Sequence, residues 1–337
     1  MASTLAQQLA QVQLLQGQAP GYKKPKGKPS LLFDYQKAAD VDGAAIYEIG
    51  CQGFSDLCRL NPQFSALREA LFSRAAASVL RDSLDPAAAT QLNEAVEEFC
   101  LLLTQHFLSP GAFRALEYLI RQFRVHEYNV DSLMRAALAY HSTNEFVRLV
   151  QVLTLDPSRG LWSWLSPIKS SGAALPRTQL VARCLRDSAL LHFMAAAAAK
   201  QGARGRAAST AYLSFYAVTL CEVVQQMEVI DDKLLSSLLP YISSGLEQGT
   251  ATAYREATLM VVAALCSRTS LRKELLRGVV NSALRNIEAG PDAMRLVLMT
   301  LAHMAHTQPS LTLIPSKALK VTQLTQCHPL LPGSARL

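Results

Sequence analysis

The sequence predicts an all-α protein made of repeated antiparallel helix pairs. Half of the 337 residues are hydrophobic and only 7% are aromatic. The apolar excess is carried by Leu and Ala, which favour helix over strand. Apolar residues recur at spacings of three and four, whereas no run shows the alternation typical of a strand. Short breaks separate segments that are each one helix long.

The first thirty residues differ from the rest. Residues 1–16, "MASTLAQQLAQVQLLQ", are expected to form an N-terminal helix, and they lack the basic-then-apolar order of a secretory signal. Residues 17–30, "GQAPGYKKPKGKPS", form a basic linker of Pro, Gly and Lys. Since no run approaches ~18 apolar residues, we expect a soluble protein that is not secreted.

Segments with the helix period follow one another from residue 31 to residue 310. The clearest are "DVDGAAIYEIGCQGFSDLCRL", "DPAAATQLNEAVEEFCLLLTQHF", "TQLVARCLRDSALLHFMAAAAAK", "STAYLSFYAVTLCEVVQQM", "DDKLLSSLLPYISSGLEQ", "TAYREATLMVVAALCSR", "LRKELLRGVVNSALRNIEAG" and "PDAMRLVLMTLAHMAHTQ". Helix pairs that repeat at roughly 40 residues indicate a HEAT/armadillo-like α-solenoid. A compact all-α bundle stays open as an alternative. Residues 311–337 are expected to be an irregular, disordered tail.

The stretch "LEYLIRQFRVHEYNVDSLM", residues 116–134, raises the choice between an active site and a helix joint. Its first part continues an amphipathic helix. The apolar face consists of Phe113, Leu116, Ile120 and Phe123, and the opposite stripe of Arg114, Glu117, Arg121 and Arg124. The letters "VHEYN" then interrupt the period.

Two more helices follow the interruption. Asn129 or Asp131 is expected to cap the first of them. Leu133, Ala137 and Tyr140 are expected on one face of it, with Met134 and Leu138 beside them. Ser142 and Glu145 have the spacing of a capping box for the next helix, whose buried stripe is Phe146, Leu149, Val150 and Leu153. We therefore interpret Tyr128, Asn129, Asp131, Ser132 and Leu133 as the architecture of a helix joint.

Two later segments carry further expectations. Residues 164–177, "WLSPIKSSGAALPR", are expected to form a long loop, which Trp162 and Trp164 anchor against helices. Residues 291–320 are expected to be the weakest part of the solenoid, because a terminal unit needs a polar cap. The apolar positions that would lack cover there are Met294, Leu296, Leu298, Met299, Leu301 and Met304.

No motif predicts catalysis or a metal. A zinc protease helix needs a second histidine four residues after the first, but Val130 stands there after His126. His303 and His306 could offer two ligands, fewer than a site usually requires. Phosphate-binding loops, dinucleotide fingerprints and nucleophile elbows are absent from the sequence. We expect a protein that is not an enzyme, with no cofactor, no metal and no small-molecule substrate.

The net charge of +7 is concentrated at the two ends. Residues 1–40 hold five Lys against two Asp, and residues 201–337 hold 13 basic against nine acidic residues. Lys23, Lys24, Lys26 and Lys28 lie in the proline-punctuated linker, where such a run suits RNA phosphates or a nuclear-import receptor. A merely solvated linker is equally compatible with the pattern. The seven scattered cysteines indicate reduced core thiols.

The chain resembles the N-terminal region of the HEAT repeat-containing protein 1 family. The matching text includes "TLAQQL", "SLLFD", "IGCQGF", "NPQF", "ALEYLIRQFRVHEYNVDSLM", "YHSTNEFVRLVQVL", "WLSPIKSSGAAL", "LLPYISSGL" and "YREATLMV". These segments run in the family's order from the start to about residue 310. Members of this family are the large HEAT-repeat subunits of the t-UTP (UtpA) subcomplex of the small-subunit processome.

The resemblance implies a non-enzymatic scaffold located in the nucleus, in the nucleolus. Its expected role is in pre-rRNA processing, namely 18S rRNA maturation, and in support of transcription by RNA polymerase I. The implied partners are the other t-UTP subunits, including β-propeller proteins, together with pre-rRNA and the small nucleolar ribonucleoprotein, and no membrane. A general solenoid adaptor of the nuclear-transport kind is the alternative.

Overall fold

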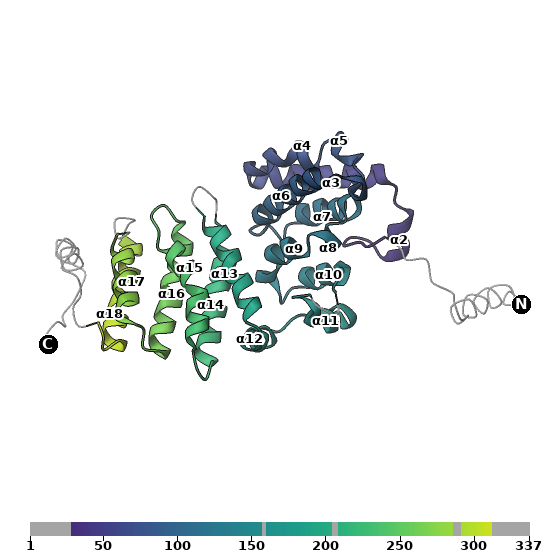
Figure 1. The fold of residues 1–337 in the computed structure, drawn as a ribbon. Coiled ribbons are helices and arrows are strands. Elements are labelled where there is room, and N and C mark those ends of the chain that lie inside the picture. The colour runs from purple at the N-terminus through teal and green to yellow at the C-terminus, as the bar shows by residue number, and fades with distance from the viewer. Residues whose placement is uncertain (1–27, 157–159, 204–207, 286–290, 312–337) are drawn as a thin grey trace, which may run out of the picture. The chain divides into compact units, whose positions relative to one another are not determined.

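The computed structural model describes residues 28–156, 160–203, 208–285 and 291–311 (Figure 1). Within these ranges the chain forms 17 α-helices and four short 3-10 helices, and no strand. The all-α fold class is confirmed. The helix expected for residues 1–16, the linker up to residue 27 and the tail from residue 312 lie outside the described residues.

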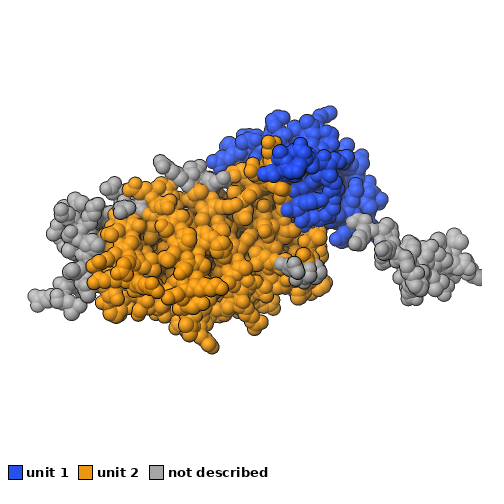
Figure 2. Space-filling model, viewed as in Figure 1, with its two compact units in different colours: residues 1–90, 109–128 blue, residues 91–108, 129–337 orange. Residues whose placement is uncertain are grey.

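The chain divides into two compact units, shown in separate colours in Figure 2. Unit 1 comprises residues 1–90 and 109–128, and unit 2 comprises residues 91–108 and 129–337. The expected single solenoid over residues 31–310 stays a prediction.

Unit 1 is built around two long helices. Its elements are α2 (Tyr35–Asp40), α3 (Gly43–Leu60), η1 (Pro62–Leu67), α4 (Arg68–Leu71), α5 (Arg74–Ala77), η2 (Arg81–Ser83), α7 (Pro110–Phe123) and α8 (Val125–Tyr128). Asp42 and Ser109 begin the long helices α3 and α7, because the side chain of each accepts a backbone N–H of the first turn. The predicted apolar face of α7 is buried throughout.

Helices α3 and α7 approach each other closely at three glycines. A Cβ built on Gly53 would lie 2.5 Å from the carbonyl oxygen of Gly111 and 2.8 Å from the backbone nitrogen of Ala115. A Cβ on Gly50 would lie 2.4 Å from Cβ of Tyr118. The family-like segment "IGCQGF" therefore supplies a smooth helix surface, which lets the two backbones nearly touch.

Unit 2 holds the longer run of helices. Its elements are α9 (Val130–Ala137), η3 (Leu138–Tyr140), α10 (Asn144–Val152), η4 (Ser163–Leu165), α11 (Ser166–Ser171), α12 (Arg177–Arg186), α13 (Ser188–Gly202), α14 (Thr210–Gln226), α15 (Asp232–Gly245), α16 (Thr252–Arg268), α17 (Lys273–Arg285) and α18 (Pro291–Thr307), with most of α6 (Pro86–Leu103).

The helices from α12 to α18 form two layers (Figure 1). Contacts join α12 to α14, α14 to α16 and α16 to α18 in one layer, and α13 to α15 in the other. Neighbouring helices also pack in pairs, α12 with α13, α13 with α14, α15 with α16 and α17 with α18. Such stacking of helix pairs is consistent with a HEAT-like solenoid.

Three local expectations are corrected. The segment 178–200 is not one helix, because Asp187 ends α12 and caps α13 with its own side chain. The expected loop 164–177 contains α11, which starts at Ser166 with a proline in its first turn. The helix after the joint is capped by Thr143 and not by Ser142, since the Thr143 side chain accepts from the backbone N–H of Phe146.

Helix α18 is less exposed than expected. Leu301 and Met304 are buried, whereas 61% of the surface of Met299 is exposed. The expectation of uncovered apolar residues is therefore wrong for Leu301 and Met304. Their burial follows from the packing of α18 against α16 and α17.

Candidate functional site

The four linker lysines are the candidate contacts to RNA or to an import receptor. Lys23, Lys24 and Lys26 lie outside the described residues. Lys28 is exposed and lines a pocket of unit 1. Their role stays a prediction.

Tyr128 ends α8 within a charged surface cluster of unit 1. Its hydroxyl donates to Asp82 Oδ1 at 2.8 Å, and this hydrogen bond is the main cause of its raised pKa. The Arg81 guanidinium carbon lies 4.5 Å from the centre of the Tyr128 ring. Asp82 also accepts from Arg124 Nη1 at 2.8 Å. The cluster connects η2 to α8 and shows no arrangement of nucleophile and base.

Arg124 ends α7 in the left-handed conformation, with φ of 51°. This conformation costs a residue with a Cβ about 1–2 kcal/mol, whereas glycine adopts it freely. Both Arg124→Gly and Arg124→Ala lose the contacts to Asp82. We expect the glycine variant to unfold at a higher urea concentration than the alanine variant. Equal midpoints, or a lower one for glycine, would show that the left-handed turn does not limit stability.

The first residues of unit 2 do not cap α9 through their side chains, so that expectation is wrong. Asn129 occupies the N-cap position without a capping hydrogen bond from its side chain. Its Nδ2 instead donates to Asn93 Oδ1 at 2.9 Å. Asp131 Oδ1 accepts from Trp162 Nε1 at 2.7 Å. These side chains form longer-range contacts, which compete with the local cap.

Ser132 and Leu133 are buried in α9. Together with the contacts of Tyr128, Asn129 and Asp131, their burial supports the interpretation of this stretch as architecture, which stays a prediction. Trp162 also packs edge-on against Phe193, with 4.9 Å between ring centres.

His126 and His303 both lie beside polar side chains. His126 is buried with Nε2 3.3 Å from Glu127 Oε1, and His303 Nε2 lies 2.7 Å from Ser267 Oγ. Over the described ranges, no three His, Cys, Asp or Glu side chains come together as metal ligands would. Burial raises the pKa of the Cys100 and Cys184 thiols to about 12, which keeps them protonated.

Glu117 is the polar residue whose environment the sequence pattern misses. It was expected on the polar stripe of α7, but its side chain is fully buried. Its Oε2 accepts from the backbone N–H groups of Leu31 at 2.7 Å and Leu32 at 3.1 Å. Its Oε1 accepts from Arg121 Nε at 2.7 Å, and Arg121 Nη1 donates to the Ala38 carbonyl at 2.7 Å. The only sequence signal is the spacing of four between Glu117 and Arg121.

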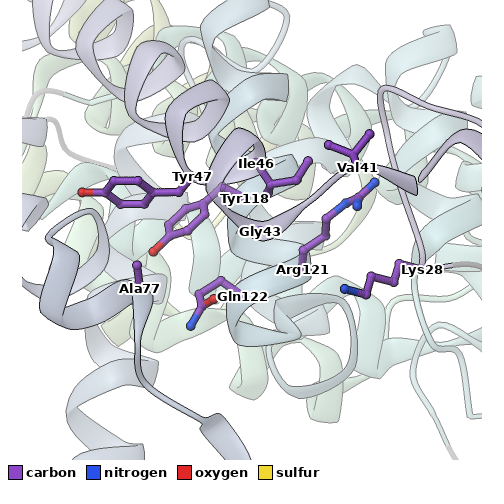
Figure 3. Close-up of a pocket in the computed structure, with 9 residues that line it drawn as sticks. All are labelled: Lys28, Val41, Gly43, Ile46, Tyr47, Ala77, Tyr118, Arg121 and Gln122. Carbon is purple, nitrogen blue, oxygen red and sulfur yellow. The ribbon is translucent and has the colours of Figure 1, made fainter. Parts of the chain in front are cut away.

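A pocket of about 180 Å³ lies beside this buried pair in unit 1 (Figure 3). Nine residues line it, namely Lys28, Val41, Gly43, Ile46, Tyr47, Ala77, Tyr118, Arg121 and Gln122. They come from the segment before α2, from α3 and its preceding turn, from α5 and from α7. None of the nine is acidic.

Unit 2 carries a line of exposed apolar side chains that we call the apolar stripe. It consists of Val218 on α14, Met260 on α16 and Met299 on α18, with exposed fractions of 46%, 43% and 61%. Each is the ninth residue of a helix of 17 residues. These helices pack in one layer, α14 on α16 and α16 on α18. The stripe is a candidate surface for another protein.

Comparison with known proteins gives two lines of similarity. A family model described as U3 small nucleolar RNA-associated protein 10 matches residues 234–328, which begin in α15. Human HEAT repeat-containing protein 1 is 30% identical over 299 residues, 87% of this chain and 14% of the human protein. The chain is homologous to these proteins.

Other relatives extend the similarity across eukaryotes. The HEAT repeat-containing protein 1 homolog of Drosophila melanogaster is 31% identical over 83% of this chain. U3 small nucleolar RNA-associated protein 10 of Aspergillus niger is 32% identical over 84% of it. The chain spans only 13% and 16% of the length of these two relatives. Among the described helices, none has the length and apolar character that a membrane crossing requires.

Proposed function

We propose that this chain belongs to the HEAT repeat-containing protein 1 family and is a non-enzymatic scaffold of the small-subunit processome. Its role is nucleolar pre-rRNA processing towards 18S rRNA, with support of transcription by RNA polymerase I. The carrying observation is the similarity, over more than four fifths of the chain, to relatives named for HEAT repeats and for U3 small nucleolar RNA. The chain corresponds to the N-terminal region of those proteins.

The helical architecture supports a scaffolding role. Stacked helix pairs expose successive surfaces on which several proteins can bind at once. The apolar stripe on α14, α16 and α18 provides one such surface, and its proposed occupant is a protein subunit of the processome. Other t-UTP subunits, including β-propeller proteins, are the proposed partners, and pre-rRNA and the U3 ribonucleoprotein are held in the same assembly.

Replacing Met260 by Glu is expected to reduce binding to processome proteins at least about tenfold, since a charge at the centre of an apolar interface must be desolvated without a partner. The tagged chain is purified from growing cells, and the yields of t-UTP proteins and U3 RNA are quantified. The matched control is Val229→Glu, because Val229 is 80% exposed and lies outside the stripe, between α14 and α15.

The two variants separate binding from folding. Both replaced side chains are exposed, so both proteins should keep the helical circular dichroism of the parent. If Met260→Glu and Val229→Glu recover the same amount of t-UTP proteins, the stripe does not bind them. If the unaltered chain recovers neither t-UTP proteins nor U3 RNA, the proposed function itself fails.

Replacing Lys23, Lys24, Lys26 and Lys28 together by Ala is expected to weaken RNA association and leave protein partners largely bound. Lysines that neutralise phosphates release counterions, so the logarithm of the binding constant falls linearly with the logarithm of the salt concentration. The steepness of this slope should decrease by up to about 3 when four such contacts are lost. Binding of a pre-rRNA fragment is measured at several salt concentrations. An unchanged slope, together with loss of the protein partners, would reverse the assignment of the linker to RNA.

A further inference from the structure

We infer that the pocket of unit 1 receives an acidic side chain, with its adjoining backbone carbonyl, from a protein partner. The pocket holds about 180 Å³, which exceeds the ~30 Å³ that one water occupies in the liquid. Its lining contains donors that the described part of the chain leaves without a hydrogen bond. This inference concerns a different surface from the apolar stripe, and it shares only Lys28 with the linker lysines.

Two of these donors are fixed and buried. The hydroxyl of Tyr118 belongs to a side chain of which only 2% is exposed, and it has no hydrogen-bond partner among the described residues. Nη2 of Arg121 is likewise unpartnered there, although Nε and Nη1 of the same side chain bind Glu117 and the Ala38 carbonyl. Buried donors of this kind are rare in folded proteins because the missing bond is unfavourable. Both require an acceptor oxygen.

The positions of the donors specify an occupant with acceptors at both ends. Figure 3 shows the Tyr118 oxygen on the side of Ala77 and Gln122, whereas the end of Arg121 extends towards Val41, and Lys28 lies on the same side of the pocket as Arg121. An acidic residue has such a pair of acceptors, its side-chain carboxylate and its own backbone carbonyl. The carboxylate faces Arg121 and Lys28, and the carbonyl faces Tyr118.

The charge and the apolar surface of the pocket both suit an acidic side chain. The carboxylate of Glu117 is already used by Arg121 and by two backbone N–H groups. The positive ammonium group of Lys28 is therefore the charge in excess among the lining residues. Val41, Ile46 and Ala77 supply apolar wall, which suits the methylene groups of a glutamate. RNA fits less well, because a phosphate backbone is recognised by runs of cations and this pocket offers one exposed lysine.

The test titrates the full chain with the blocked peptide acetyl-Gly-Ser-Glu-Ser-Gly-amide, and with the same peptide carrying Gln in place of Glu. Binding is followed by the NMR shifts of the backbone amides of Gly43, Ile46 and Gln122. The Glu peptide is expected to shift these amides, with an affinity at least about tenfold higher than that of the Gln peptide, because hydrogen bonds to a charged acceptor are stronger. Equal affinities, or no shift at millimolar peptide, would overturn the proposal.

Two tyrosines of the lining give a matched pair of variants. Tyr118→Phe removes a hydroxyl that has no partner, so we expect peptide affinity to fall about fivefold and the urea midpoint to stay level or rise. Tyr47→Phe removes a hydroxyl that donates to the Phe72 carbonyl at 3.1 Å, so we expect the opposite, a lower midpoint and unchanged affinity. The same effect of both variants on affinity would argue against a specific role for Tyr118.

A third variant tests the charge. Lys28→Ala alters an exposed side chain, so the variant should fold normally. It should bind the Glu peptide more weakly than the parent does, and this binding should depend less on salt concentration. An RNA oligonucleotide that shifts the same amides and that the Glu peptide does not displace would assign the pocket to phosphate, and would overturn the inference.

Discussion

Replacing Glu117 by Gln is expected to lower the free energy of unfolding of unit 1 by about 3–5 kcal/mol, because it leaves the buried Arg121 guanidinium without its counter-charge. The amide NH₂ of the new side chain would also face N–H donors, since both carboxylate oxygens accept hydrogen bonds in the parent. Urea unfolding measures the total effect. Hydrogen exchange of the Leu31 and Leu32 amides, which donate to Glu117, measures it locally.

The matched control is Asp56→Asn, also in unit 1. Asp56 pairs with Arg59 and Arg114 at 3.2 and 3.3 Å, but all three side chains are more than a third exposed. Exposed pairs of this kind contribute about 0–1 kcal/mol because water and salt screen them. If Glu117→Gln were as mild as Asp56→Asn, the carboxylate of Glu117 would not hold the segment at residues 31–32.

Replacing Gly53 by Ala is expected to destabilise unit 1 by about 1–3 kcal/mol through overpacking. The new methyl group would meet the backbone of α7 at 2.5 and 2.8 Å, and backbone atoms cannot move aside as a flexible side chain does. Urea unfolding and the exchange rates of α3 and α7 amides measure the effect.

Gly278→Ala is the control with the opposite sign. Gly278 lies inside α17, and a Cβ built there meets nothing within 4 Å. Alanine favours an exposed helix interior over glycine by about 1 kcal/mol, so this variant should be more stable than the parent. A gain of stability in both variants would mean that helix propensity and not the α3–α7 approach controls the outcome.

Sequence reasoning predicted the helices where the apolar period was long. The buried faces of α7 and α10 are those expected, because Phe113, Leu116, Phe146 and Leu149 recur at the helix period. It failed at short elements such as α11, whose six residues are too few to show a period. It also failed at caps, since Asn129 and Asp131 bind distant partners, Asn93 and Trp162, in place of the helix end.

The candidate sites were less predictable than the helices. The four linker lysines can be identified as a candidate site from composition alone. Their proposed role is inferred from the sequence and not from contacts in the structure. The pocket lined by Tyr118 and Arg121 could not be found in this way, since its walls come from four separate segments. The apolar stripe has a sequence signal, a spacing of 42 and then 39 residues between Val218, Met260 and Met299, but exposure at those positions is a property of the packed helices.

The sequence by itself determined the all-α class, the long helices with their buried faces, and the resemblance to the HEAT repeat-containing protein 1 family. These features depend on residues that are close together in the sequence. Helix periodicity is set by neighbouring residues, and the resemblance is carried by short segments that follow the family's order. Only the tertiary structure decided that Glu117 is buried, that Gly53 meets Gly111, and that the stripe faces solvent. Leu31 and Glu117 are 86 positions apart, and contacts at such separation arise only when the packed core brings the segments together and excludes water from them.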